Sequence, residues 1–310
     1  MKPASRSASV NEVIWIRSLY ESECGLSNRI IEDLDLFFSG INCRFLQFEP
    51  KNADALLQYL DDLVIRAQQG AKPVLHLDTH GDAKDGLLIA ASKEFIGWAR
   101  IVDSFRQINV PASNNLIVIS GACFSAHLLL DLDFFQPSPF FALYAPEKSI
   151  NAGFLEDNLR RFYSELFGTA SLDAALTHLN PDIALYSSQN LLFRLLVGYV
   201  KNFCLGKGGE RRLEKLLTEA KEAVRGSGQP LSHWRAFAKR GIEPTAQLIY
   251  KAENEFLIGK SSGFTIDDVV KAAQESLFED QRRLAENRRR EKNQKKAARR
   301  TSRSRRDSGG

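Results

Sequence analysis

Two stretches, VLHLDTHG at Val74–Gly81 and LIVISGAC at Leu116–Cys123, decide how the rest of the chain is interpreted. Each has the composition of a buried β-strand, and each carries a chemically reactive side chain at its end, His80 and Cys123 respectively. In open α/β sheets, binding and catalytic groups gather just beyond the carboxyl ends of the strands. The two stretches therefore predict that an imidazole and a thiol meet at one edge of a sheet.

This pair of residue types predicts nucleophilic catalysis by a cysteine. A thiol is only slightly ionised at neutral pH, and a neighbouring imidazole can accept its proton or stabilise the thiolate. Residues 124–130 have the pattern of a helix start, and a helix N-terminus directly after Cys123 would further favour the anion. Gly81 lets a carbonyl group approach closely, and its N–H with that of Cys123 would form an oxyanion hole.

Two simpler interpretations of these residues remain open. A cysteine at a strand end is often an inert core residue, and a histidine is often structural. His76 and His80 are spaced like the histidines of the H-E-x-x-H zinc motif, but that motif needs a helix and a Glu where this chain has Leu77. On a strand the two imidazoles would lie about 13 Å apart, too far for one metal ion. We therefore expect neither a metal nor a cofactor.

The two strand ends resemble those of the caspase-like cysteine peptidases, and most closely the CHAT domains, which are mostly bacterial. In CHAT domains the His-Gly strand often carries another histidine four residues earlier, as His76 precedes His80 here. Their cysteine strand typically ends in Ser-Ala-Cys, which is similar to Ser120–Cys123. A third stretch, Phe162–Leu176, resembles the Phe-Tyr, Leu, Gly, Ala-Leu pattern that follows the catalytic strand. The resemblance spans residues 74–176.

The chain also departs from the family pattern. Residues 124–126 replace the usual Thr-Gly or Ser-Gly turn after the cysteine, and Gly121 is an additional residue. The caspase signature Q-A-C-x-G does not fit, since Gly121 stands in place of Gln and Ser125 in place of the last Gly. The resemblance implies an endopeptidase with a His80/Cys123 dyad that cleaves one or few partner proteins. It also implies regulation by an activating partner, often within a bacterial defence system.

Acidic residues near the predicted dyad suggest a substrate preference. Asp78 and Asp82 flank His80 in sequence, and Lys84 is the nearest cation. On a strand Asp78 projects from the same face as His80, so its carboxylate would border the substrate pocket. An acidic rim favours cleavage after Arg, Lys or an uncharged residue over cleavage after Asp. The alternative is that these aspartates are solvated loop residues.

Alternating strand and helix patterns predict an α/β fold with a mostly parallel sheet flanked by helices, of the caspase-like type that the resemblance implies. A first domain over residues 1–205 would hold this sheet. Strands are expected at 13–16, 45–48, 74–80, 86–90, 116–123 and 140–144, and helices at 26–38, 54–69 and 94–107.

Beyond residue 205 the patterns are helical. We expect a helical subdomain over 206–264 and a long helix from residue 265 that runs into a basic tail without regular structure by 310. The expected helices of the subdomain cover 210–225, 231–239 and 245–258.

Composition agrees with these assignments. A chain of 310 residues with 44% hydrophobic and 26% charged residues can bury an α/β core and carry a second module. Four cysteines without C-x-x-C spacing predict neither disulfides nor a zinc finger, which favours a reducing cytoplasm. No apolar run approaches the length of a membrane span, so no membrane partner is expected.

The positive charge is expected to lie wholly in the tail. Residues 280–310 contain 13 Lys or Arg against four Asp or Glu, a net charge of +9, which leaves −5 for the rest of a chain whose total is +4. Such a tail predicts binding to nucleic acid or another acidic partner, although it could simply be solvated. The alternative function is therefore a non-catalytic adaptor that binds through the tail. A nucleotide-binding α/β domain is disfavoured because both Gly-rich phosphate motifs are missing.

Overall fold

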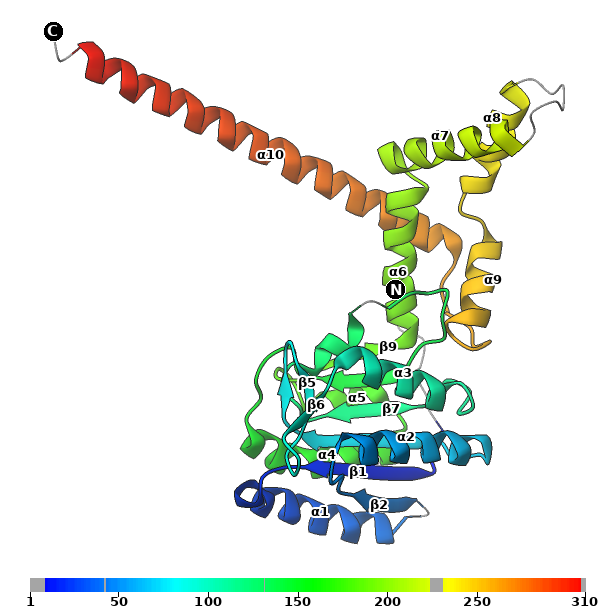
Figure 1. Cartoon of the computed structure of the whole chain (residues 1–310), viewed down its shortest axis with the longest axis vertical. Helices are drawn as coiled ribbons and strands as arrows, with labels where there is room; N and C mark the ends of the chain where they lie inside the picture. Colours follow the sequence, from blue (N-terminus) through cyan, green and yellow to red (C-terminus); the bar gives the residue numbers. More distant parts are fainter. Residues whose placement is uncertain (1–8, 42, 131, 224–230, 308–310) are drawn as a thin grey trace. The chain divides into compact units, whose positions relative to one another are not determined.

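The computed structural model describes residues 9–41, 43–130, 132–223 and 231–307. Its centre is a six-stranded sheet in the order β2-β1-β3-β7-β8-β9 (Figure 1). The neighbouring strands pair in parallel up to β8, and only β9 is antiparallel. The strands are β1 (Glu12–Ser18), β2 (Arg44–Phe48), β3 (Pro73–Thr79), β7 (Ile117–Ser120), β8 (Ala142–Ala145) and β9 (Ala184–Ser187).

Helices cover both faces of this sheet, which explains why its strands read as continuous apolar runs. One face packs against α1 (Cys24–Ser39), α4 (Ala152–Thr169) and α5 (Leu172–Leu176). The other face carries α2 (Ala53–Gln68) and α3 (Trp98–Asn109), which pack against each other. The predicted α/β class with a mostly parallel sheet and flanking helices is confirmed.

Smaller elements lie around the carboxyl ends of the strands. A short antiparallel sheet contains β4 (Gly81–Asp82), β5 (Gly86–Ile89) and β6 (Glu94–Ile96). Two 3-10 helices, η1 (Glu21–Glu23) and η2 (Ser125–Leu129), follow β1 and β7. The single helix predicted over 94–107 is therefore wrong in its first turn, where residues 94–96 pair with β5.

His76 is a core residue of the sheet. Its ring stacks on Trp15 of β1 with 3.7 Å between centroids and 6° between planes. Its Nδ1 lies 2.9 Å from the hydroxyl of Tyr163 on α4. Complete burial lowers the pKa of His76 to about 3, so the imidazole is neutral at physiological pH.

The chain divides into two compact units (Figure 1). The first comprises Met1–Leu192 and Tyr250–Gly263, and the second Phe193–Ile249 and Phe264–Gly310. The first unit thus ends within α6 (Ser188–Phe203) rather than at residue 205. The division at 263/264 lies next to the expected end at residue 264, but residues 250–263 belong to the first unit and those from 264 onward join 193–249 in the second.

Buried polar contacts explain why segment 250–263 belongs to the first unit. The ammonium group of Lys260 donates to the carbonyl oxygen of Asn114 at 2.7 Å and lies 4.9 Å from the centre of the Phe141 ring. The side-chain amide of Asn114 in turn donates to the carbonyl of Leu257 at 3.2 Å. These groups lie where β7 and β8 begin, so the segment is held at the amino ends of the central strands.

The second unit is built of helices. Besides most of α6 it contains α7 (Gly206–Ala223), α8 (Leu231–Ile242), the start of α9 (Ala246–Glu255) and α10 (Ile266–Asp307). Lys201 of α6 forms an ion pair of 2.7 Å with Asp280 of α10. In the described part of the chain, no helix is both long and apolar enough to cross a bilayer.

The tail predicted to lack regular structure is helical as far as Asp307, so that expectation is corrected. Residues 264–307 contain neither Gly nor Pro and are rich in Ala, Arg, Lys, Gln and Glu, which favour helix. Residues 308–310 of the predicted tail lie outside the described residues.

We predict that His76 makes the fold sensitive to acid. Between pH 6.5 and about 3 the unfolded chain binds a proton that the folded protein does not. The free energy of unfolding should therefore fall as the pH is lowered through this window, by at most about 1.4 kcal/mol per pH unit. Urea titrations of the wild type and His76→Gln would measure the two slopes.

The variant should be less stable overall but show a shallower pH dependence. His233→Gln is the matched control, because His233 is exposed on α8. Asp78, two residues further along β3, has a raised pKa, so its protonation stabilises the folded protein as the pH falls and opposes the effect of His76. The contribution of His76 is therefore the difference between the slopes of the wild type and His76→Gln. Equal slopes in the wild type and His76→Gln would contradict the prediction.

Candidate active site

The strands that carry the two reactive residues are neighbours in the central sheet. β3 and β7 pair in parallel, with Leu77 opposite Ser120. The ladder extends one residue further, because the N–H of Gly121 donates to the carbonyl of Leu77 at 2.8 Å. His80 directly follows β3 and Cys123 lies three residues beyond β7. Both residues therefore leave the sheet at its carboxyl edge, on adjacent strands.

The backbone of Gly81 contacts the backbone of Cys123. A Cβ atom added to Gly81 would lie 2.2 Å from the carbonyl oxygen of Cys123 and 3.3 Å from the Cβ of Ala122. No residue with a side chain fits at position 81 without a shift of the cysteine segment. The two stretches singled out in the sequence thus meet at one point, and Gly81 is what permits it.

The N–H of Gly81 points away from the small sheet. The N–H of Leu88 donates to the carbonyl of His80 at 3.0 Å, beside the pair formed by Gly81 and Leu87. Gly81 is therefore a non-hydrogen-bonded position of this antiparallel ladder, where the N–H faces outward. In the described part of the chain, the backbone N–H of Cys123 donates no hydrogen bond.

The segment after Cys123 differs from the predicted helix start. Only the five-residue 3-10 helix η2 follows Cys123. So short a helix has only a small dipole, and the expected stabilisation of the Cys123 thiolate by a helix N-terminus is not supported. Phe124 has a φ of 59°, a left-handed conformation that is unfavourable for a bulky residue. The N–H of Ala126 donates to the carbonyl of Pro146 at 3.2 Å, which ties this turn to the segment after β8.

His80 is held by Glu23, a residue that the sequence analysis did not single out. Its Nε2 lies 2.7 Å from Oε2 of Glu23, and the ring of Tyr20 lies 5.6 Å away. The Glu23 carboxylate also accepts the backbone N–H of Tyr20 at 3.0 Å. Both side chains of the pair are about two-fifths exposed, at 39% and 41%. Burial raises the pKa of Glu23, but the hydrogen bonds from His80 and Tyr20 outweigh it and leave the pKa lowered.

The sequence offered no local signal for Glu23. In the structure Glu23 closes the turn after β1, since its carboxylate accepts the N–H of Tyr20 and its own N–H donates to the Tyr20 carbonyl. Tyr20, however, is not one of the residues by which a capping box is recognised in a sequence. Nothing local indicates that this turn lies beside a histidine 57 residues later in the chain.

Asp78, predicted to border the substrate pocket, anchors α1. Its Oδ2 accepts hydrogen bonds from the hydroxyl of Ser27 on α1 and from Nε1 of Trp15, the latter at 3.2 Å. Burial raises the pKa of Asp78, and these hydrogen bonds together with Arg17 and His80 oppose the shift only in part. Through Ser27 the carboxylate positions the N-terminal part of α1, and so the preceding turn that carries Glu23.

Asp82, the second predicted pocket residue, is exposed and shapes a turn. Its Oδ1 accepts the backbone N–H groups of Lys84 at 2.7 Å and Asp85 at 2.9 Å. These two bonds lower the pKa of Asp82, so the carboxylate is charged at neutral pH.

The four cysteines are free thiols in different surroundings. Burial and the charge of Glu12 raise the pKa of Cys43 to about 11. Burial also raises the pKa of Cys204. Both residues are therefore protonated and slow to react at neutral pH.

The residues that the structure describes contain no cluster of three or more His, Cys, Asp and Glu side chains suited to a metal ion. His76 forms a hydrogen bond with Tyr163 and His80 one with Glu23. The two histidines of the zinc alternative thus face different partners and do not form one site.

In comparisons with known proteins, no protein-family model matches the chain and no curated protein is significantly similar to it. The functional assignment therefore depends on the residues and geometry described above.

We predict that Gly81→Ala destabilises the first unit. The new Cβ would overlap the carbonyl oxygen of Cys123, a backbone atom that is held by the surrounding turn. Overpacking of this kind costs about 1–3 kcal/mol. Urea unfolding would measure the decrease in stability. Gly168→Ala is the control, because Gly168 is an exposed residue of α4 with no atoms within 4 Å of the added Cβ. Equal stability of the two variants would contradict the contact.

We further predict that His80→Asn raises the pKa of Glu23. The substitution removes the strongest interaction that lowers this pKa, while the contribution of burial, which raises it, persists. A pH titration of the Glu23 carboxyl followed by NMR would show the shift. His127→Asn should leave the titration unchanged, because the charge of His127 acts on Asp82 instead. An unchanged midpoint in His80→Asn would show that the two side chains are not paired in solution.

Proposed function

We propose that the first unit is a cysteine endopeptidase of the caspase-like, CHAT type, with Cys123 as nucleophile and His80 as general base and acid. The contact between Gly81 and the Cys123 carbonyl carries this proposal, because it joins the His-Gly and Ala-Cys strand ends. A six-stranded, mostly parallel sheet flanked by helices is compatible with the caspase-like fold that the resemblance implies.

Catalysis would proceed through a thioester. The thiolate of Cys123 attacks the carbonyl carbon of the scissile bond, and the developing oxyanion is stabilised by the N–H groups of Gly81 and Cys123. The intermediate collapses as the C–N bond breaks, and protonated His80 gives its proton to the leaving amine. His80 then accepts a proton from water, the water oxygen attacks the thioester, and the acid product and free thiol are released.

Glu23 would serve as a positioning residue. Because its carboxylate engages Nε2 of His80, the nitrogen that remains for proton transfer is Nδ1. The carboxylate also restricts the orientation of the ring and stabilises its protonated form. The family resemblance implies no obligatory third acid, so removal of Glu23 should reduce activity without abolishing it.

The substrate class would be one or few partner proteins in a reducing cytoplasm, which suits four free thiols. Asp82 is the exposed acidic group nearest to His80 in sequence, and it supports a basic or uncharged residue before the scissile bond over Asp. An activating partner, as in regulated peptidases of this type, is part of the proposal.

The alternative from another class is a non-catalytic adaptor that uses this fold as a scaffold and binds an acidic partner through the basic part of α10. The exposed Arg and Lys residues of that helix favour it. Cys123 distinguishes the two functions, because a peptidase requires a reactive thiol at the strand end and an adaptor does not.

We predict that Cys123→Ala and His80→Ala each abolish peptide cleavage, by about three orders of magnitude or more, while the fold is retained. Cleavage of a peptide library followed by mass spectrometry would measure the rates and the residue before the cut. The control is Cys43→Ala, which removes a thiol that burial keeps protonated. Cleavage that survives in Cys123→Ala would overturn the mechanism. A dominant preference for Asp would overturn the proposed specificity.

A further inference from the structure

The positive charge of the chain is concentrated in the second unit. The first unit contains 17 Lys or Arg against 25 Asp or Glu, a net charge of −8. The second contains 25 against 13, a net charge of +12. Residues 193–249 alone hold 11 basic and five acidic residues, so the expectation that all the positive charge lies in the tail is wrong.

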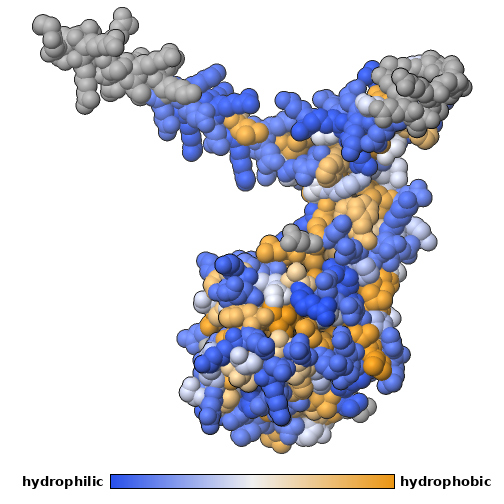
Figure 2. Space-filling view, viewed as in Figure 1, coloured by the Kyte–Doolittle hydropathy of each residue, from blue (hydrophilic) through white to orange (hydrophobic). Residues whose placement is uncertain are grey.

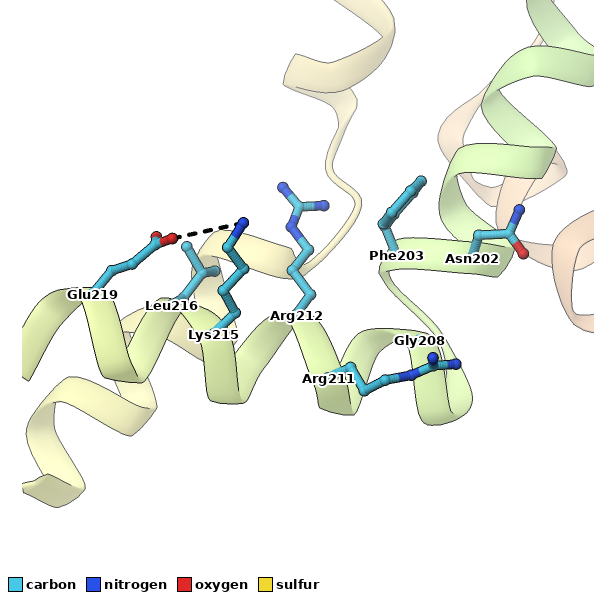
Figure 3. A pocket seen from close by; sticks show the side chains of 8 residues that line it. All are labelled: Asn202, Phe203, Gly208, Arg211, Arg212, Lys215, Leu216 and Glu219. Carbon is cyan, nitrogen blue, oxygen red and sulfur yellow. Dashed lines mark ion pairs between the residues drawn. The ribbon is translucent and has the colours of Figure 1, made fainter.

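A pocket of about 560 Å³ lies where α6 meets α7 (Figure 3). The end of α6 contributes Asn202 and Phe203, and α7 contributes Arg211, Arg212 and Lys215. Figure 3 shows Phe203, Arg212 and Lys215 extending to the same side of α7. Leu216 and Glu219 of α7 also line the pocket, so one wall is aromatic and polar and the other carries three cations and one carboxylate.

The corner between the two helices is tightly built. A Cβ atom on Gly208 would lie 2.0 Å from the carbonyl oxygen of Asn202, and one on Gly209 would lie 2.7 Å from that of Cys204. The backbones of α6 and α7 therefore touch, and two glycines permit the approach. This contact holds the lining side chains of the two helices at a set spacing.

The cations of the pocket are poorly neutralised by the protein. Arg212 is oriented by the hydroxyl of Tyr199, 2.6 Å away, but this partner is neutral. Lys215 forms an ion pair of 3.8 Å with the Glu219 carboxylate. This pair is weak, because the two side chains are 78% and 57% exposed to solvent. Arg211 has no carboxylate partner among the described residues and donates only to the carbonyl of Lys207. An anionic ligand would complete this group.

Aromatic rings beside the cations narrow the class of anion. Phe203 is 49% exposed, and the ring of Tyr199 lies 5.5 Å from it, with Arg212 over the Tyr199 ring at 5.3 Å. An inorganic anion or a chain of carboxylates such as polyglutamate makes no use of an exposed ring, whereas a nucleobase stacks on one. The amide of Asn202 next to Phe203 offers a donor and an acceptor for a base edge.

The same unit provides a track for further phosphates. Along α10 the side chains of Arg282, Arg283, Arg288, Arg289 and Arg290 are all exposed. Figure 2 shows mostly hydrophilic residues along this helix. No aromatic residue follows Phe278, so this part of α10 can neutralise a backbone but cannot stack bases.

The geometry points to the pocket between α6 and α7 as a binding site for one nucleotide of a single-stranded nucleic acid. The base stacks on Phe203, and Arg212 and Lys215 hold its phosphate. Arg211, whose side chain extends toward Gly208, binds a neighbouring phosphate. The basic face of α10 contacts neighbouring phosphates of the strand. This inference is independent of the proposed peptidase, since Cys123 and His80 take no part in it.

Fluorescence anisotropy with a labelled oligouridylate, measured at several salt concentrations on the full-length protein, tests the site. Phe203→Ala should weaken binding about 5- to 150-fold, because stacking contributes about 1–3 kcal/mol per base, and should leave the salt dependence unchanged. Phe237→Ala is the matched control, since Phe237 is a similarly exposed ring on α8 outside the pocket. Circular dichroism checks the fold of each variant.

Charge variants separate the pocket from general attraction. Arg211→Gln with Lys215→Gln should lower the slope of log affinity against log salt by about 0.7 for each phosphate that these side chains no longer neutralise. Lys239→Gln with Arg240→Gln removes the same charge from exposed positions on α8 and should leave affinity and slope near those of the wild type. Cys123→Ala should bind like the wild type, which keeps this test separate from peptidase activity.

Three results would overturn the inference. The first is unchanged affinity in Phe203→Ala, or an equally large decrease in Phe237→Ala. The second is binding of polyglutamate or heparin as tight as that of the oligouridylate, which would make the site a general polyanion surface. The third is tighter binding of a duplex of the same length, whose bases are not available for stacking on Phe203.

Discussion

The parallel pairing of β3 with β7 is the constraint on which the candidate site depends. It brings the ends of two distant segments side by side, and the ladder continues through the bond from Gly121 to Leu77. The absence of a side chain at Gly81 then lets the two loops touch at the Cys123 carbonyl. Any residue with a Cβ at that point would move the cysteine segment away from the histidine segment. The sheet aligns the two strand ends, and the glycine allows the backbones of the two loops to touch.

Polar contacts on one face of the sheet connect the aligned strand ends to the core. On one face of β3, His76 stacks on Trp15 and contacts Tyr163, and Asp78 holds Ser27 of α1. Because α1 is held at this point, the turn before it places Glu23 against His80. Neutral His76 and partly buried Asp78 are thus structural residues of the strand that presents His80. His76, Asp78 and His80 follow one another at intervals of two residues, so the two structural residues and the candidate catalytic residue lie on the same face.

The two units differ in their net charge. The acidic first unit contains the strand ends with thiol and imidazole, and the basic second unit contains the pocket between α6 and α7 together with α10. A strongly positive unit is suited to a polyanion, and an exposed aromatic ring next to cations selects for bases among polyanions.

The sequence by itself determined the α/β class and most strands and helices of the first unit, because apolar runs and their periodicity are local patterns. It also predicted that the Gly81 and Cys123 segments meet, because the carboxyl ends of parallel strands lie at one edge of a sheet. It misjudged the turn after Cys123, where a left-handed Phe124 precedes a 3-10 helix. It also let the long helix from residue 265 pass into a tail without regular structure, although the chain lacks Gly and Pro from residue 264 to Asp307. Only the tertiary structure decided that Glu23 holds His80, that Asp78 holds Ser27, and that Phe203 shares a pocket with Arg212. These pairs join segments whose separation in sequence carries no periodic signal, so their contact depends on how the helices pack.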